Sequence, residues 1–204
     1  MRRTYTLVFA SIMVTMAGAA YAMTSPAMMD AVLAHRWIML ACVFVPLIAA
    51  QAMRNSFPQN IGFVFLFTFA EGLYIAPFLA VMEQHSPGSV SQAGLLTFSA
   101  FAALTAYAFI SRRDFSAWGG FLVTGLIVLL VTIVLMAITG STSGYTWISG
   151  IAVLLFSGLL VFDTSRLRNV YGPDDYVMAA VNIYLDLLNM FLFILSLLSG
   201  NRRN

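Results

Sequence analysis

Seven apolar runs follow one another along this chain of 204 residues, and only short hydrophilic turns separate them. About 20 apolar residues are enough for a helix to cross the hydrocarbon core of a bilayer. Only 9% of the residues are charged and 61% are hydrophobic, whereas soluble domains carry about 25% charged residues. The sequence therefore predicts an all-α membrane protein. We expect one polytopic domain over residues 1–204, a seven-transmembrane helix bundle with helices at about 5–23, 37–53, 61–82, 93–110, 119–139, 147–165 and 176–199.

The first apolar run also has features of a secretory signal peptide. Arg2 and Arg3 precede it, and Ala20-Tyr21-Ala22 imitates a small-residue cleavage site. The alternative is an uncleaved spanning helix, in which the small residues 17–20 let a neighbouring helix approach closely. We favour the spanning helix, because a polytopic protein needs no cleavable signal.

The positions of the arginine residues predict the orientation in the membrane. With the N-terminus in the cytoplasm, more arginines fall on the inner side than on the outer side, as the positive-inside rule requires. The inner set is Arg2, Arg3, Arg54, Arg112, Arg113, Arg166 and Arg168, and the outer set is Arg36, Arg202 and Arg203. A re-entrant last run would instead bring the last two arginines inside.

The composition also argues against several classes of function. The basic residues are scattered rather than gathered into a patch, so we expect no nucleic-acid partner. The single Cys42 forms no disulfide framework, and His35 and His85 have no metal-ligand spacing to a second His or Cys. We therefore expect no cofactor.

Two aspartates carry most of the functional information. Asp163 follows the apolar run 148–162, and Asp186 lies inside the apolar run 176–198. A carboxylate in the membrane interior costs about 3 kcal/mol or more, so such residues are usually paired and functional. The two runs are consecutive and must pack as an antiparallel hairpin, which makes the aspartates a candidate buried acid pair.

The chemistry of such a pair follows from electrostatics. Two facing carboxylates in a low dielectric share a proton and titrate as a unit. The protonated pair holds two helices together by a hydrogen bond. Deprotonation replaces that bond with repulsion and creates an oxygen site suited to a hard cation such as Ca²⁺. Asp163 and Asp186 are thus candidates for a pH sensor, a gate and a Ca²⁺ site.

The partner of each aspartate is open to more than one interpretation. Arg166 is three residues after Asp163, so a structural ion pair within one helix is the alternative for that carboxylate. No basic residue lies within the helix of Asp186. Arg54, at the inner end of the second predicted helix, is a candidate for its counter-charge.

Other polar residues inside the predicted helices suggest a pathway. Asn182, Asp186, Asn189 and Ser196 fall on one face of the last helix, which therefore faces protein or water rather than lipid. The alternative for the two asparagines is ordinary hydrogen bonding between helices. Glu71, in the middle of the third run and before Pro77, is a further pathway-lining candidate, although the proline is equally consistent with a packing kink.

Several motifs of this chain resemble the Bax-inhibitor family, also called the YccA-like or transmembrane Bax-inhibitor-motif family. They are Val161-Phe162-Asp163-Thr164, the loop ending in Asp174-Asp175-Tyr176, the long segment 179–195 around Asp186, and Thr68-Phe69-Ala70-Glu71-Gly72-Leu73 with Pro77. The resemblance covers essentially the whole chain. The short end 200–204 departs from eukaryotic members, which have a basic cytoplasmic tail, and is closer to bacterial members.

The resemblance implies a seven-helix bundle with a central last helix and a Ca²⁺ leak conductance that an aspartate dyad gates in response to pH. By motif, the dyad corresponds to Asp163 and Asp186, and an arginine of the second helix, here Arg54, latches the closed form. It also implies the bacterial inner membrane, and some bacterial members associate with a membrane-bound protease.

Two aspartates on neighbouring membrane helices are consistent with four functions. We expect a pH-sensitive, calcium-permeable leak channel, and the alternative is a non-conducting membrane protein that modulates a protease or another membrane partner. An intramembrane aspartyl protease is disfavoured, because Tyr184-Leu185 precede Asp186 where those enzymes carry Gly-x-Gly. Proton-driven transport is disfavoured, because we see no inverted repeat. We expect no enzymatic activity.

Overall fold

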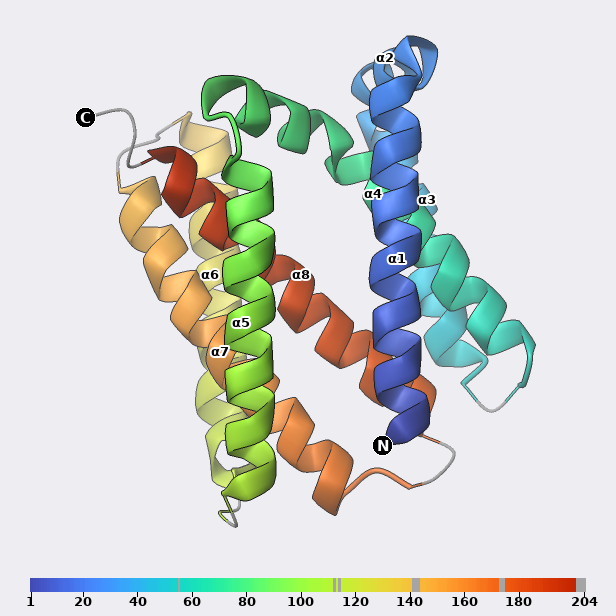
Figure 1. Cartoon of the computed structure of the whole chain (residues 1–204), viewed down its shortest axis with the longest axis vertical. Helices are drawn as coiled ribbons and strands as arrows, with labels where there is room; N and C mark the ends of the chain where they lie inside the picture. The colour runs from blue at the N-terminus through green and yellow to red at the C-terminus, as the bar shows by residue number, and fades with distance from the viewer. Residues whose placement is uncertain (55, 112, 114, 141–143, 173–174, 201–204) are drawn as a thin grey trace. The chain divides into compact units, whose positions relative to one another are not determined.

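The computed structural model describes residues 1–54, 56–111, 113, 115–140, 144–172 and 175–200, and these residues form helices and short connections. Figure 1 shows the helices in chain order. They are α1 (Arg2–Thr24), α2 (Pro26–Ala34), α3 (Arg36–Ala52), α4 (Gln59–His85), α5 (Ser89–Ile110), the 3-10 turn η1 (Ser116–Trp118), α6 (Gly119–Thr139), α7 (Tyr145–Asn169) and α8 (Tyr176–Gly200). The prediction of an all-α membrane protein is confirmed. Arg112, Arg202 and Arg203, which entered the orientation count, lie outside the described residues.

The number of spans differs in one place from the predicted seven. Six of the described helices, α1 and α4 to α8, are long and apolar enough to cross a membrane. The second predicted span corresponds to α3, which has only 17 residues. It qualifies as a span only together with α2, to which it is joined at an angle of 90°.

Helix α2 lies between the first two predicted helices, where Ser25-Pro26 is a sequence typical of a turn. The same two residues start a helix instead. The hydroxyl of Ser25 accepts a hydrogen bond from the backbone N–H of Met28 at 3.4 Å, and Pro26 occupies the first helical position. Both are favourable at a helix start, since the first N–H groups have no partner within the helix.

Two helices extend past their predicted ends. The sequence suggested a turn from Ser165, whereas α7 continues to Asn169. Arg166 and Arg168 lie in its last turn, where positive charge interacts favourably with the helix dipole. His85, expected in a loop, is the last residue of α4. As a result, Asp163 lies inside α7 rather than at its end.

The chain forms two compact units, one of residues 1–84 with 171–184 and one of residues 85–170 with 185–204. In the first unit α1 and α4 meet backbone to backbone. A Cβ atom on Gly72 would collide with the carbonyl oxygen of Thr15 and lie 2.9 Å from the backbone nitrogen of Ala19. A Cβ on Gly18 would likewise collide with the carbonyl oxygen of Phe69. Only glycine allows this close approach at either position.

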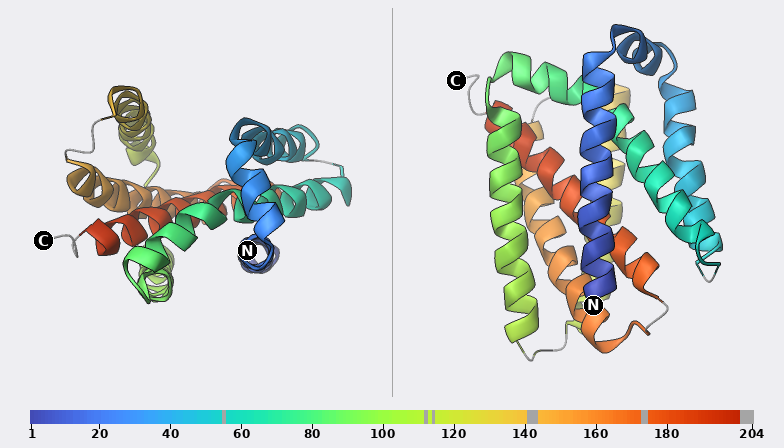
Figure 2. Two further views of the ribbon diagram at one scale, coloured as in Figure 1. Left: turned by 90° about the horizontal axis from the view of Figure 1, so that it is seen from above. Right: turned by 45° about the vertical axis from the view of Figure 1, so that its right-hand side comes forward.

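In the second unit α7 packs against both α5 and α6, and Figure 2 shows these helices from two further sides. The centre of the α5–α7 contact is a small apolar core of Ala108, Phe115 and Val161, with Leu104 and Phe162 against it. The ring of Phe115 also meets the ring of Trp118 edge-on at 5.5 Å. This packing fixes the part of α7 that carries Asp163.

Helix α8 is covered along its whole length. Each of its 25 residues is buried or half-buried, whereas only Leu122 and Leu129 are buried in α6. This burial agrees with the prediction that the polar face of the last helix is turned away from lipid. It also means that Asp186 cannot meet lipid without a change in packing.

Candidate functional site

Two consecutive helices supply the carboxyl groups of the candidate site. Asp163 comes from α7 and Asp186 from α8, and both belong to the second unit. Their exposed fractions are 8% and 6%. The two carboxyl groups lie within hydrogen-bonding reach of each other. The structure thus brings together the two aspartates that the sequence singled out.

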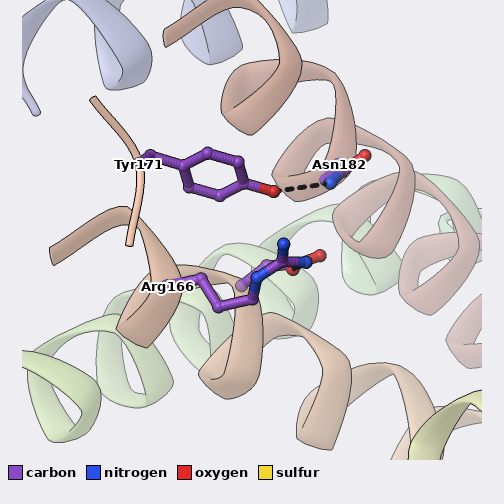
Figure 3. A network of polar contacts seen from close by, with 4 residues as sticks. Arg166, Tyr171 and Asn182 are labelled. Atoms are coloured by element: carbon purple, nitrogen blue, oxygen red, sulfur yellow. Dashed lines mark hydrogen bonds and ion pairs between the residues drawn. The ribbon is translucent and has the colours of Figure 1, made fainter. Parts of the chain in front are cut away.

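Asp163 also contacts a cation on its own helix. Its Oδ1 lies 3.7 Å from Nη1 of Arg166, whose side chain is 36% exposed. The guanidinium of Arg166, labelled in Figure 3, lies 5.4 Å from the ring centroid of Phe162. The predicted ion pair and the predicted acid pair are therefore both present. Asp163 lies between a cation and a second carboxyl group.

One oxygen of the pair lacks a hydrogen bond. The Oδ2 of Asp186 is buried and has no hydrogen-bond partner within the described ranges. Two ionised carboxylates offer only acceptors, and a buried unpaired acceptor is costly. A proton or a cation between the carboxylates would remove that cost.

The two asparagines of α8 are engaged in hydrogen bonds. In the first unit, Nδ2 of Asn182 donates to Oη of Tyr171 at 3.1 Å, and Figure 3 shows the two side chains directed toward each other. In the second unit, Nδ2 of Asn189 donates to the carbonyl oxygen of Leu185 at 2.8 Å, within its own helix. The bond of Asn182 favours the structural interpretation, and a pathway-lining role for either residue stays a prediction.

The comparisons with known proteins cover the whole chain. A family model described as "Inhibitor of apoptosis-promoting Bax1" matches residues 1–204. The chain belongs to the Bax-inhibitor family. It is 31% identical to Bax inhibitor 1 of Schizosaccharomyces pombe over 208 residues, which cover 100% of this chain and 77% of the relative. It is 35% identical over 158 residues to a membrane protein of Vibrio cholerae, covering 76% and 69% of the two chains. It is 34% identical over 169 residues to the Golgi anti-apoptotic protein of vaccinia virus, covering 81% and 70%.

In this Bax-inhibitor family member, the predicted latch residue belongs to the first unit. Arg54 is exposed in the turn between α3 and α4, and its backbone carbonyl accepts a hydrogen bond from Nδ2 of Asn60 at 2.8 Å. Its latch role stays a prediction. The cation that lies against the pair is Arg166.

One residue that supports the candidate site, Arg168, was not predicted from the sequence. Arg168 of α7 donates from Nη1 to three carbonyl oxygens at the end of α5, those of Ala108 at 3.4 Å, Phe109 at 3.2 Å and Ser111 at 3.2 Å. The last carbonyl groups of a helix have no partner within it, and the last turn of α5 contains no basic residue that could bind them. The lack of a basic residue there could have indicated that a basic residue from another helix binds these carbonyls. Arg168 therefore ties the segment of α7 after Asp163 to α5.

We expect Arg168→Gln to lower the midpoint of thermal unfolding. The loss of unfolding free energy should be about 1–2 kcal/mol, because the variant lacks the charge-assisted hydrogen bonds that the half-buried Arg168 donates to three carbonyl oxygens. Thermal unfolding of the purified protein in detergent measures the effect. Arg113→Gln is the matched control, since Arg113 is exposed. Equal midpoints for the two variants would contradict the capping role.

Proposed function

We propose that this Bax-inhibitor family member is a pH-sensitive, calcium-permeable leak channel gated by Asp163 and Asp186. The observation that carries the proposal is the buried carboxyl pair, which lies within hydrogen-bonding reach and lacks donors on the side of Asp186. A shared proton closes the pair by a hydrogen bond. Loss of that proton leaves two anionic groups that repel each other and attract a cation.

The small number of ligands favours a permeant ion over a resident one. Ca²⁺ prefers six to eight oxygen ligands. Within the part of the chain that the structure describes, no group of three or more His, Cys, Asp or Glu side chains is gathered for metal binding. A site of two carboxylates binds Ca²⁺ weakly, and weak binding suits an ion that must leave again.

Ca²⁺ flux into proteoliposomes tests the proposal. The purified protein is reconstituted with an internal Ca²⁺ indicator, and flux is followed from about pH 6 to 8. We expect flux above that of empty liposomes and a rise with pH. Flux no greater than in empty liposomes at every pH would reject the channel.

A second candidate is a non-conducting protein that acts on a membrane partner. The descriptions of the matching family and of the vaccinia relative name an inhibitor and an anti-apoptotic protein, and such names fit an action on other proteins. The partner class that we propose for a bacterial protein is a membrane-bound protease. In this case Asp163→Asn and Asp186→Asn would leave function intact.

The proposal includes the place and the chemistry of the protein. We propose the bacterial inner membrane with the N-terminus in the cytoplasm, Ca²⁺ as the transported ion, no cofactor and no enzymatic activity. Reporter fusions at the N-terminus and in the α4–α5 turn, which activate only on one side of the membrane, test the orientation. Three spans separate these points in the seven-span topology, so we expect activity on opposite sides of the membrane. Both fusions active on the same side would contradict the seven-span topology, because only α1 and α4 separate these points in the six-span topology. An N-terminal fusion active outside the cytoplasm would contradict the orientation.

The two candidate arginines make different predictions. Arg166→Gln removes a cation that favours the charged form of Asp163, so deprotonation should need a higher pH. We expect the flux profile to move to higher pH by about 0.5 pH units, a small shift because Arg166 is partly exposed.

Arg54→Ala should raise the leak at neutral pH, if Arg54 holds the closed form. Flux measurements on both variants separate the roles, and an unchanged leak in Arg54→Ala would remove that residue from the latch.

A further inference from the structure

Tyr184, in the first unit, is the largest of the fully buried side chains in the described part of the chain, and it makes a hydrogen bond to a residue far away in the sequence. It is only 2% exposed, and its Oη lies 2.7 Å from Oγ1 of Thr15 on α1. Thr15 gives its single hydroxyl proton to the carbonyl oxygen of Ser11 at 2.9 Å. Tyr184 must therefore be the donor to Thr15, and the lone pairs of its own oxygen remain available as acceptors.

The contacts of Tyr184 place it beside Glu71. Its ring meets the ring of Phe67 edge-on at 5.6 Å. Phe67 and Glu71 are four residues apart and lie on the same face of α4. Gly72, the next residue, packs on the backbone of Thr15, which is the acceptor of Tyr184. These contacts put Glu71 one helical turn from the ring that Tyr184 touches.

No cation compensates Glu71. Within the described part of the first unit, Glu71 makes no ion pair, and the basic residues lie at helix ends or in turns. Arg3, at the start of α1, is 12 residues from Thr15, or about 18 Å along the helix. Besides Glu71, the titratable side chains on the packed elements are Arg2, Arg3, Tyr5 and Tyr21 of α1, Tyr74, Glu83 and His85 of α4, and Tyr176, Tyr184 and Asp186 of α8. Asp186 belongs to the second unit.

We infer that Glu71, Tyr184 and Thr15 form a second carboxyl site, located in the first unit, which binds and releases a proton independently of the aspartate pair. The Glu71 carboxylate takes one proton from water and becomes a neutral acid, which membrane interiors tolerate far better than an anion. The neutral acid can then donate to the free lone pair of Tyr184. Tyr184 is a positioning residue, held by Thr15. The inference stands whether or not Asp163 and Asp186 gate a conductance.

The composition of the chain makes a selective infrared experiment possible. Glu71 and Glu83 are its only glutamates. In a Glu83→Gln protein labelled with ¹³C at the glutamate side-chain carboxyl, every isotope-shifted carboxyl band therefore belongs to Glu71. We expect a protonated Glu71 band that disappears reversibly as the pH rises. The same titration in the Asp163→Asn and Asp186→Asn backgrounds should be unchanged.

The role of Tyr184 is tested in the same labelled protein. Tyr184→Phe keeps the ring against Phe67 and removes only the hydroxyl, and Thr15→Val removes the acceptor. Each should move the titration of the Glu71 band by about 0.5 pH units or more, and the double variant should move it no further than one of them. Thr97→Val is the control, because the buried Thr97 donates only to its own helix, to Ala93 at 2.7 Å.

Three results would overturn the inference. One is a Glu71 band that shows no protonated form at any pH at which the protein is folded. Another is a titration that follows Asp163→Asn or Asp186→Asn. The last is a Tyr184→Phe protein with the wild-type titration, which would reduce Tyr184 to a packing residue.

Discussion

Asp186→Asn should abolish the pH dependence of Ca²⁺ flux. An amide neither ionises nor repels Asp163, so the event that opens the pair no longer occurs. A gate controlled by one proton changes by up to tenfold per pH unit in wild type, whereas flux in the variant should vary less than about twofold between pH 6 and 8. The proteoliposome assay with internal Ca²⁺ indicator measures both.

The control for this variant is Asp30→Asn. Asp30 is exposed on α2 in the first unit, and the substitution changes the charge of the protein equally. It should keep the wild-type profile, which separates the loss of a specific carboxylate from a general effect of net charge on Ca²⁺ attraction. An Asp186→Asn profile that still follows pH would remove the aspartate pair as the sensor.

Gly72→Ala should disrupt the packing of α1 on α4. The added Cβ meets backbone atoms of Thr15 and Ala19, and backbone cannot rotate aside as a side chain can. The helices must separate, at a cost of about 3 kcal/mol or more, which is a large part of the stability of most domains. We expect a much lower yield of folded protein and a clearly lower midpoint of thermal unfolding in detergent.

Gly62→Ala on the same helix is the matched control. A Cβ at Gly62 has nothing within 4 Å, so alanine there should be neutral or slightly stabilising through its better helix propensity. If Gly72→Ala were as stable as Gly62→Ala, the backbone contact between α1 and α4 would not be a feature of the folded protein.

The sequence predicted the fold better than the boundaries of its elements. Long apolar runs locate membrane helices because bilayer thickness sets their length, and every predicted run matches a helix, with only Met53 falling one residue outside. Helix α2 was missed, because nine residues are too few to show a hydrophobic period and because Ser25-Pro26 starts a turn as readily as a helix. The extension of α7 was missed for a related reason, since Arg166 and Arg168 are hydrophilic residues in a helical last turn.

In the candidate site, contacts within one helix or between consecutive helices could be predicted from the sequence, whereas contacts between distant helices could not. The meeting of Asp163 and Asp186 was predictable, because their helices are neighbours in sequence and must pack as a hairpin. The Arg166 contact was predictable from a spacing of three residues. The bond between Tyr184 and Thr15 was not, because the two residues are 169 positions apart and neither is unusual in a membrane helix. Such contacts depend on which helices become neighbours in space.

The close approach of α1 and α4 at Gly18 and Gly72 also bears on the order in which the protein is made. α1 enters the membrane long before α4 has been synthesised, yet the surface around Gly18 is shaped for the backbone of α4 and for no side chain. Until Gly72 arrives, lipid must occupy that surface. The packing surface of α1 is therefore covered only when α4 enters the membrane, after α2 and α3. In a ribosome-bound chain that stops before α4, α1 should lack this packing partner and remain accessible to chaperones and membrane proteases.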